Sequence, residues 1–205
     1  MAREKYMKIA KASDSDFDKM YADMLLQFPA EEMKTREAFD SLRRDENYEC
    51  CILEKDGGMA GYFCAYIAGD TSVALLDHFA IASSMHGCGL GSEALRLITA
   101  RYANCKGILL EVEKPNPLDP NTLRRIKFYK SNGAYKINAD YLLPGGGDSA
   151  VPMDLYFINC AGFDGRISAE EIMQTVKIVF ERVHASFPNA GAVWKTIERS
   201  FSAGE

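Results

Sequence analysis

The 205-residue sequence predicts an α/β (α+β) fold, in which helices flank a mixed β-sheet and a further helical segment follows at the C-terminus. Two observations lead to this prediction. Strand-like and helix-like stretches follow one another in the order β-α-α-β-β-β-α-β-α-β-β over about the first 160 residues. A glycine-rich turn at 86–92 also joins a strand-like run directly to a helix-like run.

The first half of the chain contains the clearest helix and turn signals. Ser13 or Asp14 is expected to cap a helix with apolar side chains at helical spacing, and Pro29 ends that helix. Asp56-Gly57-Gly58 is the strongest turn signal and predicts a hairpin. The expected elements are a strand over 7–12, helices over 15–27 and 31–44, and strands over 48–55, 59–68 and 73–82.

The second half alternates between helices and strands and then becomes helical. Gly133 stands where a C-cap glycine belongs. Ser168 and Glu171 form a capping box that opens a helix to about Phe187, and a short helix containing Trp194 follows. The elements expected before that box are a helix over 91–104, a strand over 107–113, a helix over 121–132, and strands over 134–143 and 152–159 around a flexible loop at 144–148.

The turn His86-Gly87-Cys88-Gly89-Leu90-Gly91-Ser92 is the most informative stretch. Its glycines allow a tight backbone turn and keep side chains away from a ligand. A turn that opens into a helix directs unpaired N–H groups and the positive end of the helix dipole at one place. The stretch therefore predicts a site for a phosphate or pyrophosphate group.

Two familiar phosphate-binding patterns do not fit this turn. The third glycine comes one residue too early for the G-x-G-x-x-G pattern of dinucleotide-binding folds. A P-loop requires a Gly-Lys-Ser/Thr ending, which this turn lacks. Taken alone, the turn is equally compatible with a strand-to-helix connection that binds nothing.

A second stretch, 124–135, contains Phe128-Tyr129 on a predicted helix that ends at Gly133 and continues into a strand. In this order and spacing, the two stretches resemble motifs A and B of the GNAT superfamily of acetyl-CoA-dependent N-acyltransferases. The resemblance covers roughly residues 5–160 and is strongest over 73–135. His86 stands where the family usually has glutamine or arginine.

The resemblance implies a GNAT-like central sheet that is splayed where the strands at 73–82 and 107–113 part to admit a pantetheine arm. Residues 1–160 would form the acetyltransferase domain and residues 161–205 a C-terminal helical extension. The extension has an apolar stripe that must be covered. Packing on the domain's own sheet, a homodimer contact and a substrate-site lid remain open.

The resemblance also implies which residues bind acetyl-CoA. Main-chain groups of Phe79 and Ile81 would pair with the pantetheine amides, and an N–H of Phe79 or Ala80 would polarise the thioester carbonyl. The amides from Cys88 to Ser92 would hold the pyrophosphate. Asn116 would bind pantetheine or substrate, or would cap its own loop. The expected cofactor-binding residues are Phe79, Ala80, Ile81, His86, Gly87, Cys88, Gly89, Leu90, Gly91, Ser92, Asn116 and Tyr129.

The expected catalytic residues are Tyr129, Asp77 and Glu111. Tyr129 aligns with the family's tyrosine that protonates the leaving thiolate. Asp77 occupies a strand position where many relatives have a carboxylate. Glu111 and Glu113 are two apart on one strand and should project from the same face, where carboxylates attract an ammonium group and can accept its proton. His78 should face the opposite side from Asp77 on a regular strand, as a packed or capping histidine.

Composition limits the partners. The net charge of −5 argues against a nucleic-acid partner, and no apolar run approaches the length of a membrane span. Six cysteines without a C-x-x-C pair, and three histidines without ligand spacing, favour reduced thiols in a cytoplasmic protein without a metal site.

The sequence therefore predicts an N-acetyltransferase that moves an acetyl group from acetyl-CoA to an amine, with a small molecule favoured as acceptor, by direct attack in a ternary complex. Three alternatives stay open: acetylation of a protein lysine or N-terminus, a non-catalytic module that senses acyl-CoA, and a purely structural domain. A ping-pong reaction through Cys88 is disfavoured, because the turn would direct that thiol away from the thioester.

Overall fold

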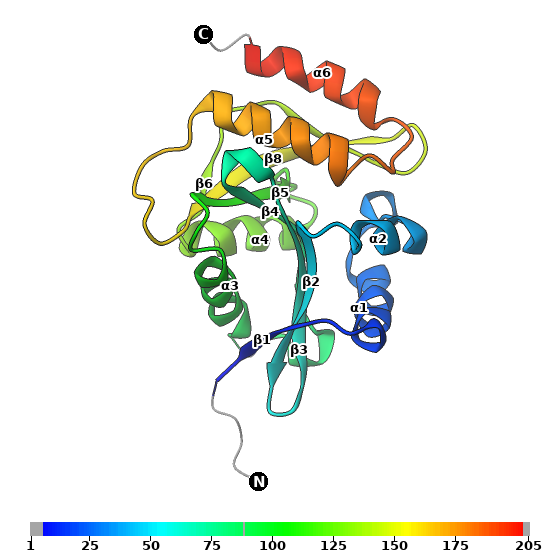
Figure 1. The fold of residues 1–205 in the computed structure, drawn as a ribbon, viewed down its shortest axis with the longest axis vertical. Helices are drawn as coiled ribbons and strands as arrows, with labels where there is room; N and C mark the ends of the chain where they lie inside the picture. Colours follow the sequence, from blue (N-terminus) through cyan, green and yellow to red (C-terminus); the bar gives the residue numbers. More distant parts are fainter. Residues whose placement is uncertain (1–5, 88, 203–205) are drawn as a thin grey trace.

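The computed structural model describes residues 6–87 and 89–202. Within them, one mixed sheet has the strand order β1-β2-β3-β4-β5-β8-β6, and β7 pairs with β8. The predicted fold class, a mixed sheet flanked by helices, is confirmed (Figure 1). The strands are β1 (Lys8–Lys11), β2 (Tyr48–Lys55), β3 (Gly58–Ile67), β4 (Val73–Ile81), β5 (Gly107–Glu113), β6 (Tyr135–Lys136), β7 (Tyr141–Pro144) and β8 (Ala150–Asn159).

Helices cover both faces of this sheet. Figure 1 shows α3 and α4 on one side and α1 and α2 on the other, with α5 and α6 over the end that contains β6 and β8. The helices are α1 (Asp14–Gln27), α2 (Arg36–Leu42), α3 (Leu90–Arg101), α4 (Pro120–Ser131), α5 (Ala169–Arg182) and α6 (Ala190–Ser202). Short 3₁₀ turns lie at Ala30–Glu32, Gly69–Thr71 and Ser83–Met85.

The connection between α1 and α2 differs from the prediction. A helix was expected from residue 31, but α2 begins at Arg36 because Thr35 is its N-cap and accepts a hydrogen bond from the amide of Ala38. Residues 28–35 are therefore a connecting segment with a single 3₁₀ turn at Ala30–Glu32. Side chains of this segment can point inward without following a helical face.

Among the other predicted elements, the hairpin is confirmed, but the bounds predicted for one strand and one helix are wrong. The hairpin turn is confirmed, with positive φ angles of 53° at Asp56 and 78° at Gly57. The single strand expected over 134–143 is instead two, β6 and β7, because the amide of Ala139 turns back to the carbonyl of Ile137. The helix after Ser168 was expected to reach about Phe187, but α5 ends at Arg182.

The apolar stripe of the C-terminal extension packs against the sheet. Val179 and Val183 share a buried cluster with residues of α1, α2, β2 and β3. Phe180 lies in a second cluster with Leu155 and Phe157 of β8. Residues 169–201 therefore complete the covering of the face that α1 and α2 cover only in part.

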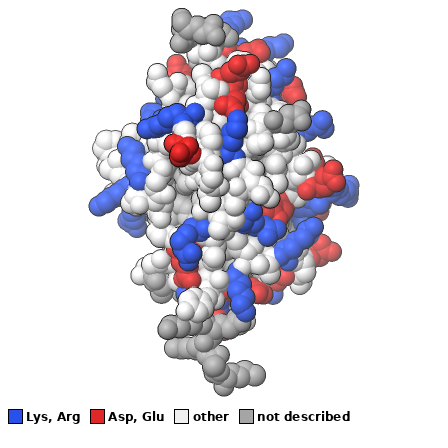
Figure 2. All heavy atoms as spheres, turned by 60° about the vertical axis from the view of Figure 1, so that its left-hand side comes forward, with Lys and Arg blue, Asp and Glu red and all other residues white. Residues whose placement is uncertain are grey.

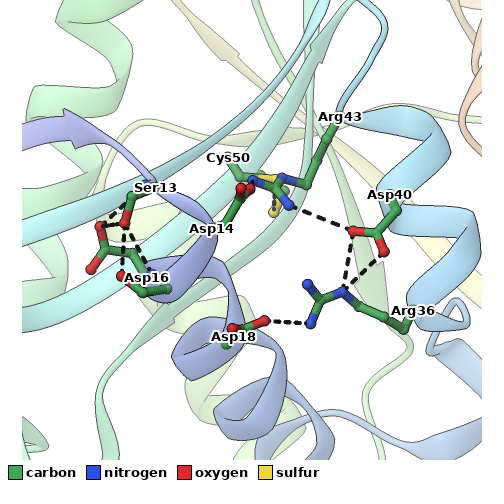
Figure 3. A network of polar contacts seen from close by, with 10 residues as sticks. Ser13, Asp14, Asp16, Asp18, Arg36, Asp40, Arg43 and Cys50 are labelled. Atoms are coloured by element: carbon green, nitrogen blue, oxygen red, sulfur yellow. Dashed lines mark hydrogen bonds and ion pairs between the residues drawn. The ribbon is translucent and has the colours of Figure 1, made fainter.

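Ion pairs fasten α1 to α2, as Figure 3 shows. Arg36 of α2 contacts Asp18 of α1 at 2.7 Å and Asp40 at 3.1 Å. Arg43, which follows α2, contacts Asp14 at 2.8 Å, and its guanidinium lies 4.3 Å from the ring centroid of Phe17. These contacts hold the beginning of α1 against both ends of α2.

The splay that the resemblance implies is present between β4 and β5. The two strands pair in parallel only from Val73 to Leu75. Opposite β3, Cys64 pairs with His78 but Ala65 pairs with Leu76, so Asp77 is an extra, bulged residue. The bulge bends β4 away from β5, and within the described residues the rest of β4, residues 76–81, has no strand partner on that side.

The charged side chains do not form a single-sign surface on the face that Figure 2 presents, where acidic and basic groups are interspersed. Within the described residues, no helix is both long and apolar enough to cross a membrane. The same part of the chain contains no cluster of three or more histidine, cysteine, aspartate or glutamate side chains arranged to hold a metal ion.

Gly107 provides a test of the packing where β4 and β5 still touch. A Cβ atom there would lie 2.3 Å from the ring of Phe157 and 2.4 Å from the carbonyl oxygen of Ile158. Gly107→Ala should therefore destabilise the protein by about 1–3 kcal/mol in urea unfolding. Gly58→Ala is the matched control, because its nearest atom would be 4.0 Å away. Equal unfolding midpoints for the two variants would show that β8 accommodates the methyl group.

Candidate functional site

Two connected hollows open at the splay between β4 and β5. A groove of about 1050 Å³ runs past the glycine-rich turn, the end of β4 and the outer side of α4. An inner cavity of about 210 Å³ lies deeper, between β4, β5 and the connection from α1 to α2. Seven residues line both hollows: Gln27, Phe28, Phe79, Ala80, Glu113, Arg125 and Tyr129. The groove and the cavity therefore meet beside Tyr129.

The start of α3 is open toward the groove. Its N-cap, Gly89, has a left-handed φ of 73°, and no side chain among the described residues caps the helix. By contrast α1, α2, α4 and α5 are capped by Ser13, Thr35, Asp119 and Ser168. The first amides of α3 are therefore available to an anion, as the sequence predicts. The expected contribution of Cys88 lies outside the described residues.

Gly91 allows α3 and α4 to approach each other closely. A Cβ atom on Gly91 would lie 3.1 Å from the ring of Phe128, which itself packs 5.2 Å from the ring of Tyr129 between centroids. His86 sits at the beginning of the turn, with its Nε2 2.8 Å from the carbonyl oxygen of Ile81. The imidazole thus ties the turn to the end of β4.

Main-chain groups of β4 line the groove after the bulge. The amide of Ala82 donates to the carbonyl of Ala60 on β3, so the alternation of a strand directs the amides of Phe79 and Ile81 toward the splay. The carbonyl of Ile81 also accepts from Gln27 Nε2 at 3.3 Å. Of the two candidates for a thioester-binding N–H, this alternation favours Phe79 over Ala80.

Tyr129 has the surroundings of a proton donor. Burial of its hydroxyl raises the pKa to about 12, although the nearby Arg125 opposes that rise. Across residues 6–87 and 89–202, the hydroxyl makes no hydrogen bond. It is therefore protonated at neutral pH and free to donate to a ligand in the groove.

Two arginines of α4 line the groove but were absent from the predicted site. Arg124 and Arg125 both face it, and Arg125 is paired with Glu113 of β5. Their positive charges suit an anionic ligand. The sequence contained a signal that Arg125 belongs to the site, because Arg125 precedes Tyr129 by one helical turn and therefore lies on the same face of the helix.

Asn116 takes the second of its two predicted roles. Its Oδ1 accepts a hydrogen bond of 3.0 Å from the amide of Leu118, and its own amide donates to Thr122 Oγ1. The side chain lines neither the groove nor the inner cavity. Asn116 therefore caps its own loop.

Asp77 lies at the inner cavity as a buried, paired carboxylate. Its side chain is 2% exposed, Lys34 Nζ lies 2.8 Å from Oδ1, and Tyr48 Oη donates to Oδ2 at 2.6 Å. Burial alone would raise the pKa, but Lys34 and His78 outweigh it and hold the pKa of Asp77 well below its ordinary value. This low pKa argues against the predicted role of Asp77 as the base.

His78 and Asp77 do not lie on opposite sides of β4, contrary to the expectation for a regular strand. His78 Nδ1 lies 3.2 Å from Asp77 Oδ2 because the bulge interrupts the alternation of side chains. The expected packing role of His78 is confirmed, since its ring is buried edge-on against Phe28 and Phe39.

Glu111 is also buried and paired. It accepts hydrogen bonds from Tyr141 Oη and, at 2.9 Å, from His184 Nε2. Burial tends to raise its pKa, but His184 and Tyr141 lower it below the ordinary value overall. His184, which follows α5, is 1% exposed and lines the inner cavity, so the C-terminal extension contributes to the site. No sequence pattern indicated that contribution.

Glu32 lines the same cavity and was also absent from the predicted site. Burial raises the pKa of Glu32 to about 7, against the opposing charge of Arg125. The sequence predicts a helix over 31–44 that would place Glu32 in its first turn, where acidic residues are common. Thr35 as an N-cap residue was the signal that the helix begins later.

The buried pair of Lys34 and Asp77 can be tested by stability. Lys34→Met should destabilise the protein by about 3–5 kcal/mol at pH 7, because Asp77 would remain buried without its cation. Since pairing lowers the pKa of Asp77, its contribution is present above the pKa of unfolded aspartate, about 3.9, and is lost as the pH falls. The deficit should therefore begin to shrink only in unfolding experiments below about pH 4, as the pH falls toward the lowered pKa of Asp77.

Lys19→Met is the control for that experiment, because Lys19 is 66% exposed and 3.9 Å from Asp16. It should change the stability by less than about 1 kcal/mol. A Lys34→Met deficit that is no larger than that of the control would contradict a tightly paired buried charge.

The comparisons with known proteins agree with this geometry. The model of the Acetyltransferase (GNAT) family matches residues 17–134, more than half of the chain. A protein of Bacillus subtilis (strain 168), "Putative acetyltransferase YjbC", is 30% identical over 110 residues. That match covers 54% of this chain and 53% of the relative, so the chain spans about half the length of the curated relative it matches.

Two solved structures show the same fold. "Putative acetyltransferase from GNAT family" of Bacteroides thetaiotaomicron superimposes with a TM-score of 0.68 at 24% identity, covering 85% of this chain and 98% of that one. Spermidine N-acetyltransferase from Vibrio cholerae, in complex with CoA and spermine, gives a TM-score of 0.60 at 12% identity, covering 76% and 96%. With the family model matching more than half of its length, the chain belongs to the GNAT family of acetyltransferases.

Proposed function

We propose that this protein is an acetyl-CoA-dependent N-acetyltransferase that acetylates a small cationic amine by direct attack in a ternary complex. The observation that carries the proposal is the meeting of the groove and the inner cavity beside Tyr129. The groove offers sites for an anionic cofactor, and the inner cavity offers carboxylates for a cationic acceptor. An amine and a thioester bound in the two hollows would be adjacent.

The groove suits acetyl-CoA. The uncapped amides at 89–92 and the positive charge of Arg124 fit a pyrophosphate group. The unpaired edge of β4, with the amides of Phe79 and Ile81, fits the amides of a pantetheine arm. His86 and Gly87 shape the turn between these two sites. When bound, acetyl-CoA supplies the acetyl thioester.

The inner cavity suits a positively charged acceptor. Four acidic side chains line it, from Glu32, Asp77, Glu111 and Glu113, together with the two basic side chains of Lys34 and Arg125. The excess of negative charge attracts an ammonium group. The small volume of about 210 Å³ favours a small molecule over a folded protein surface. The fold neighbour from Vibrio cholerae, solved with CoA and spermine, supports this class of acceptor.

The chain's own residues carry the remaining roles. Asp77 and Glu111, already paired, provide the negative potential that orients the ammonium group rather than accept its proton. The amide of Phe79 polarises the thioester carbonyl. Tyr129 Oη donates its proton to the leaving thiolate, since its raised pKa keeps it protonated until negative charge develops beside it.

The proposal is tested by incubating the protein with acetyl-CoA and a panel of amines, namely alkylamines, polyamines, aminoglycosides, amino acids and peptides, and measuring free CoA thiol. At least one small cationic amine should give turnover. Binding of CoA, measured by thermal shift, separates the rivals. Binding without turnover on any amine would indicate an acyl-CoA sensor, and turnover restricted to peptides would indicate a protein acetyltransferase.

Tyr129→Phe should lower kcat by about 10²-fold, because the leaving thiolate loses its proton donor. The CoA dissociation constant, measured by calorimetry, should stay nearly unchanged, since the ring and its contact with Phe128 are kept. Tyr6→Phe, at an exposed position, is the control and should behave as wild type. Full turnover by Tyr129→Phe would eliminate this residue as the acid.

A further inference from the structure

Direct attack requires an amine nitrogen without its extra proton. An alkylamine has a pKa near that of lysine, about 10.4, so at pH 7 nearly all of it arrives as an ammonium ion. A group at the reaction centre must therefore accept one proton before the N–C bond forms. Neither of the acids that the sequence indicated, Asp77 or Glu111, is suited to this, because both are buried, both have hydrogen-bond partners, and both have lowered pKa values.

The titratable and charged groups that line the inner cavity come from five segments, and Glu32 differs from the other carboxylates among them. Asp77 is paired with Lys34, Glu111 with His184, and Glu113 with Arg125. Within the described parts of the chain, the carboxylate of Glu32 makes no hydrogen bond and no ion pair. The complete set is Glu32 and Lys34 before α2, Asp77 and His78 on β4, Glu111 and Glu113 on β5, Arg125 and Tyr129 on α4, and His184 after α5.

Glu32 is nevertheless held in a defined position. Its amide donates to the carbonyl of Pro29 at 3.0 Å, and the carbonyl of the preceding Glu31 accepts from Gly146 at 3.1 Å. Two residues later, Lys34 is fixed by its pair with Asp77, and its carbonyl accepts from Tyr21 Oη at 3.3 Å. The segment is thus anchored before and after Glu32, whose own carboxylate has no partner in the part of the chain that the structure describes.

We propose that Glu32 is the general base that removes the proton from the acceptor's ammonium group in the inner cavity. The inference rests on the proposed function and adds a catalytic residue that lies outside β4 and β5. Its pKa supports the assignment, because burial sets it at about 7, where the carboxylate both accepts and releases a proton at neutral pH.

The proton balance is complete with two residues of the chain. Glu32 takes one proton from the ammonium group, and the free nitrogen forms a bond to the acetyl carbonyl carbon while the C–S bond breaks. Tyr129 Oη gives its proton to the departing sulfur. As the amide forms, the nitrogen loses a second proton, which restores the hydroxyl of Tyr129. Glu32 then releases to solvent the proton that it accepted from the ammonium group. The products are an N-acetylamine, CoA thiol and one proton.

Glu32→Gln tests the proposal without changing the shape of the side chain. With the most reactive primary amine of the panel, kcat at pH 7 should fall by about 10²-fold or more. The thermal shift with CoA should be kept, because Glu32 lines the inner cavity and not the groove. Glu31→Gln is the matched control, since the neighbouring carboxylate is exposed and does not line the cavity, and its kcat should stay within twofold of wild type.

The pH dependence separates a base from a mere binding charge. The wild-type kcat should rise with pH and level off once Glu32 is deprotonated. In Glu32→Gln, the rate should keep rising toward the pKa of the amine itself, about 10. An unchanged pH profile, or a raised KM with an unchanged kcat, would overturn the assignment and leave Glu32 as an attracting charge only.

Failure of this proposal is distinguishable from failure of the proposed function. If wild type and Glu32→Gln turn over equally, the acetyltransferase activity stands and the role of Glu32 is lost. If the wild type binds CoA but acetylates no amine of the panel, the proposed function and the base assignment are lost together. A fall in kcat that Glu31→Gln shares would also contradict a specific role for Glu32.

Discussion

The parting of β4 from β5 is the constraint on which the rest of the site depends. The strands pair only from Val73 to Leu75, and the bulge at Asp77 then bends β4 away. The bend exposes the main chain of β4 along one edge and opens the space between the sheet and α4. The groove, the inner cavity and the position of Tyr129 between them all follow from this break in the ladder.

The same bulge places the carboxylate of Asp77 in the interior, and the segment between α1 and α2 provides its cationic partner. A carboxylate directed into the interior is costly unless a cation accompanies it, and Lys34 enters the cavity to pair with Asp77. Because Lys34 lies two residues after Glu32, the ion pair also fixes the backbone that presents Glu32 to the cavity. The charge of Asp77 on β4 therefore holds the connecting segment in place, and the carboxylate that we propose as the base lies on that segment.

The C-terminal extension completes the site as well as the core. Its stripe on α5 covers the sheet face that α1 and α2 leave open, and His184 follows directly after α5. His184 then forms a hydrogen bond of 2.9 Å with Glu111 within the cavity wall. The extension thus contributes packing to the fold and a hydrogen-bond partner to the site, because the residues that follow α5 lie against Glu111 of β5.

The local features of the fold could be predicted from the amino-acid sequence alone. Hydrophobic periodicity, caps and turn residues indicated most helices and strands, and the spacing of the glycine-rich turn and Phe128-Tyr129 predicted the groove that we propose as the cofactor site. These signals are local, since each depends on residues within a few positions of one another. The charge pairs of the site follow from contacts between segments that are distant in the sequence, for which a single sequence contains no pattern. A one-residue bulge brings His78 beside Asp77, and His184 lies against Glu111. The late start of α2 at Arg36 leaves the carboxylate of Glu32 without a partner among the described residues.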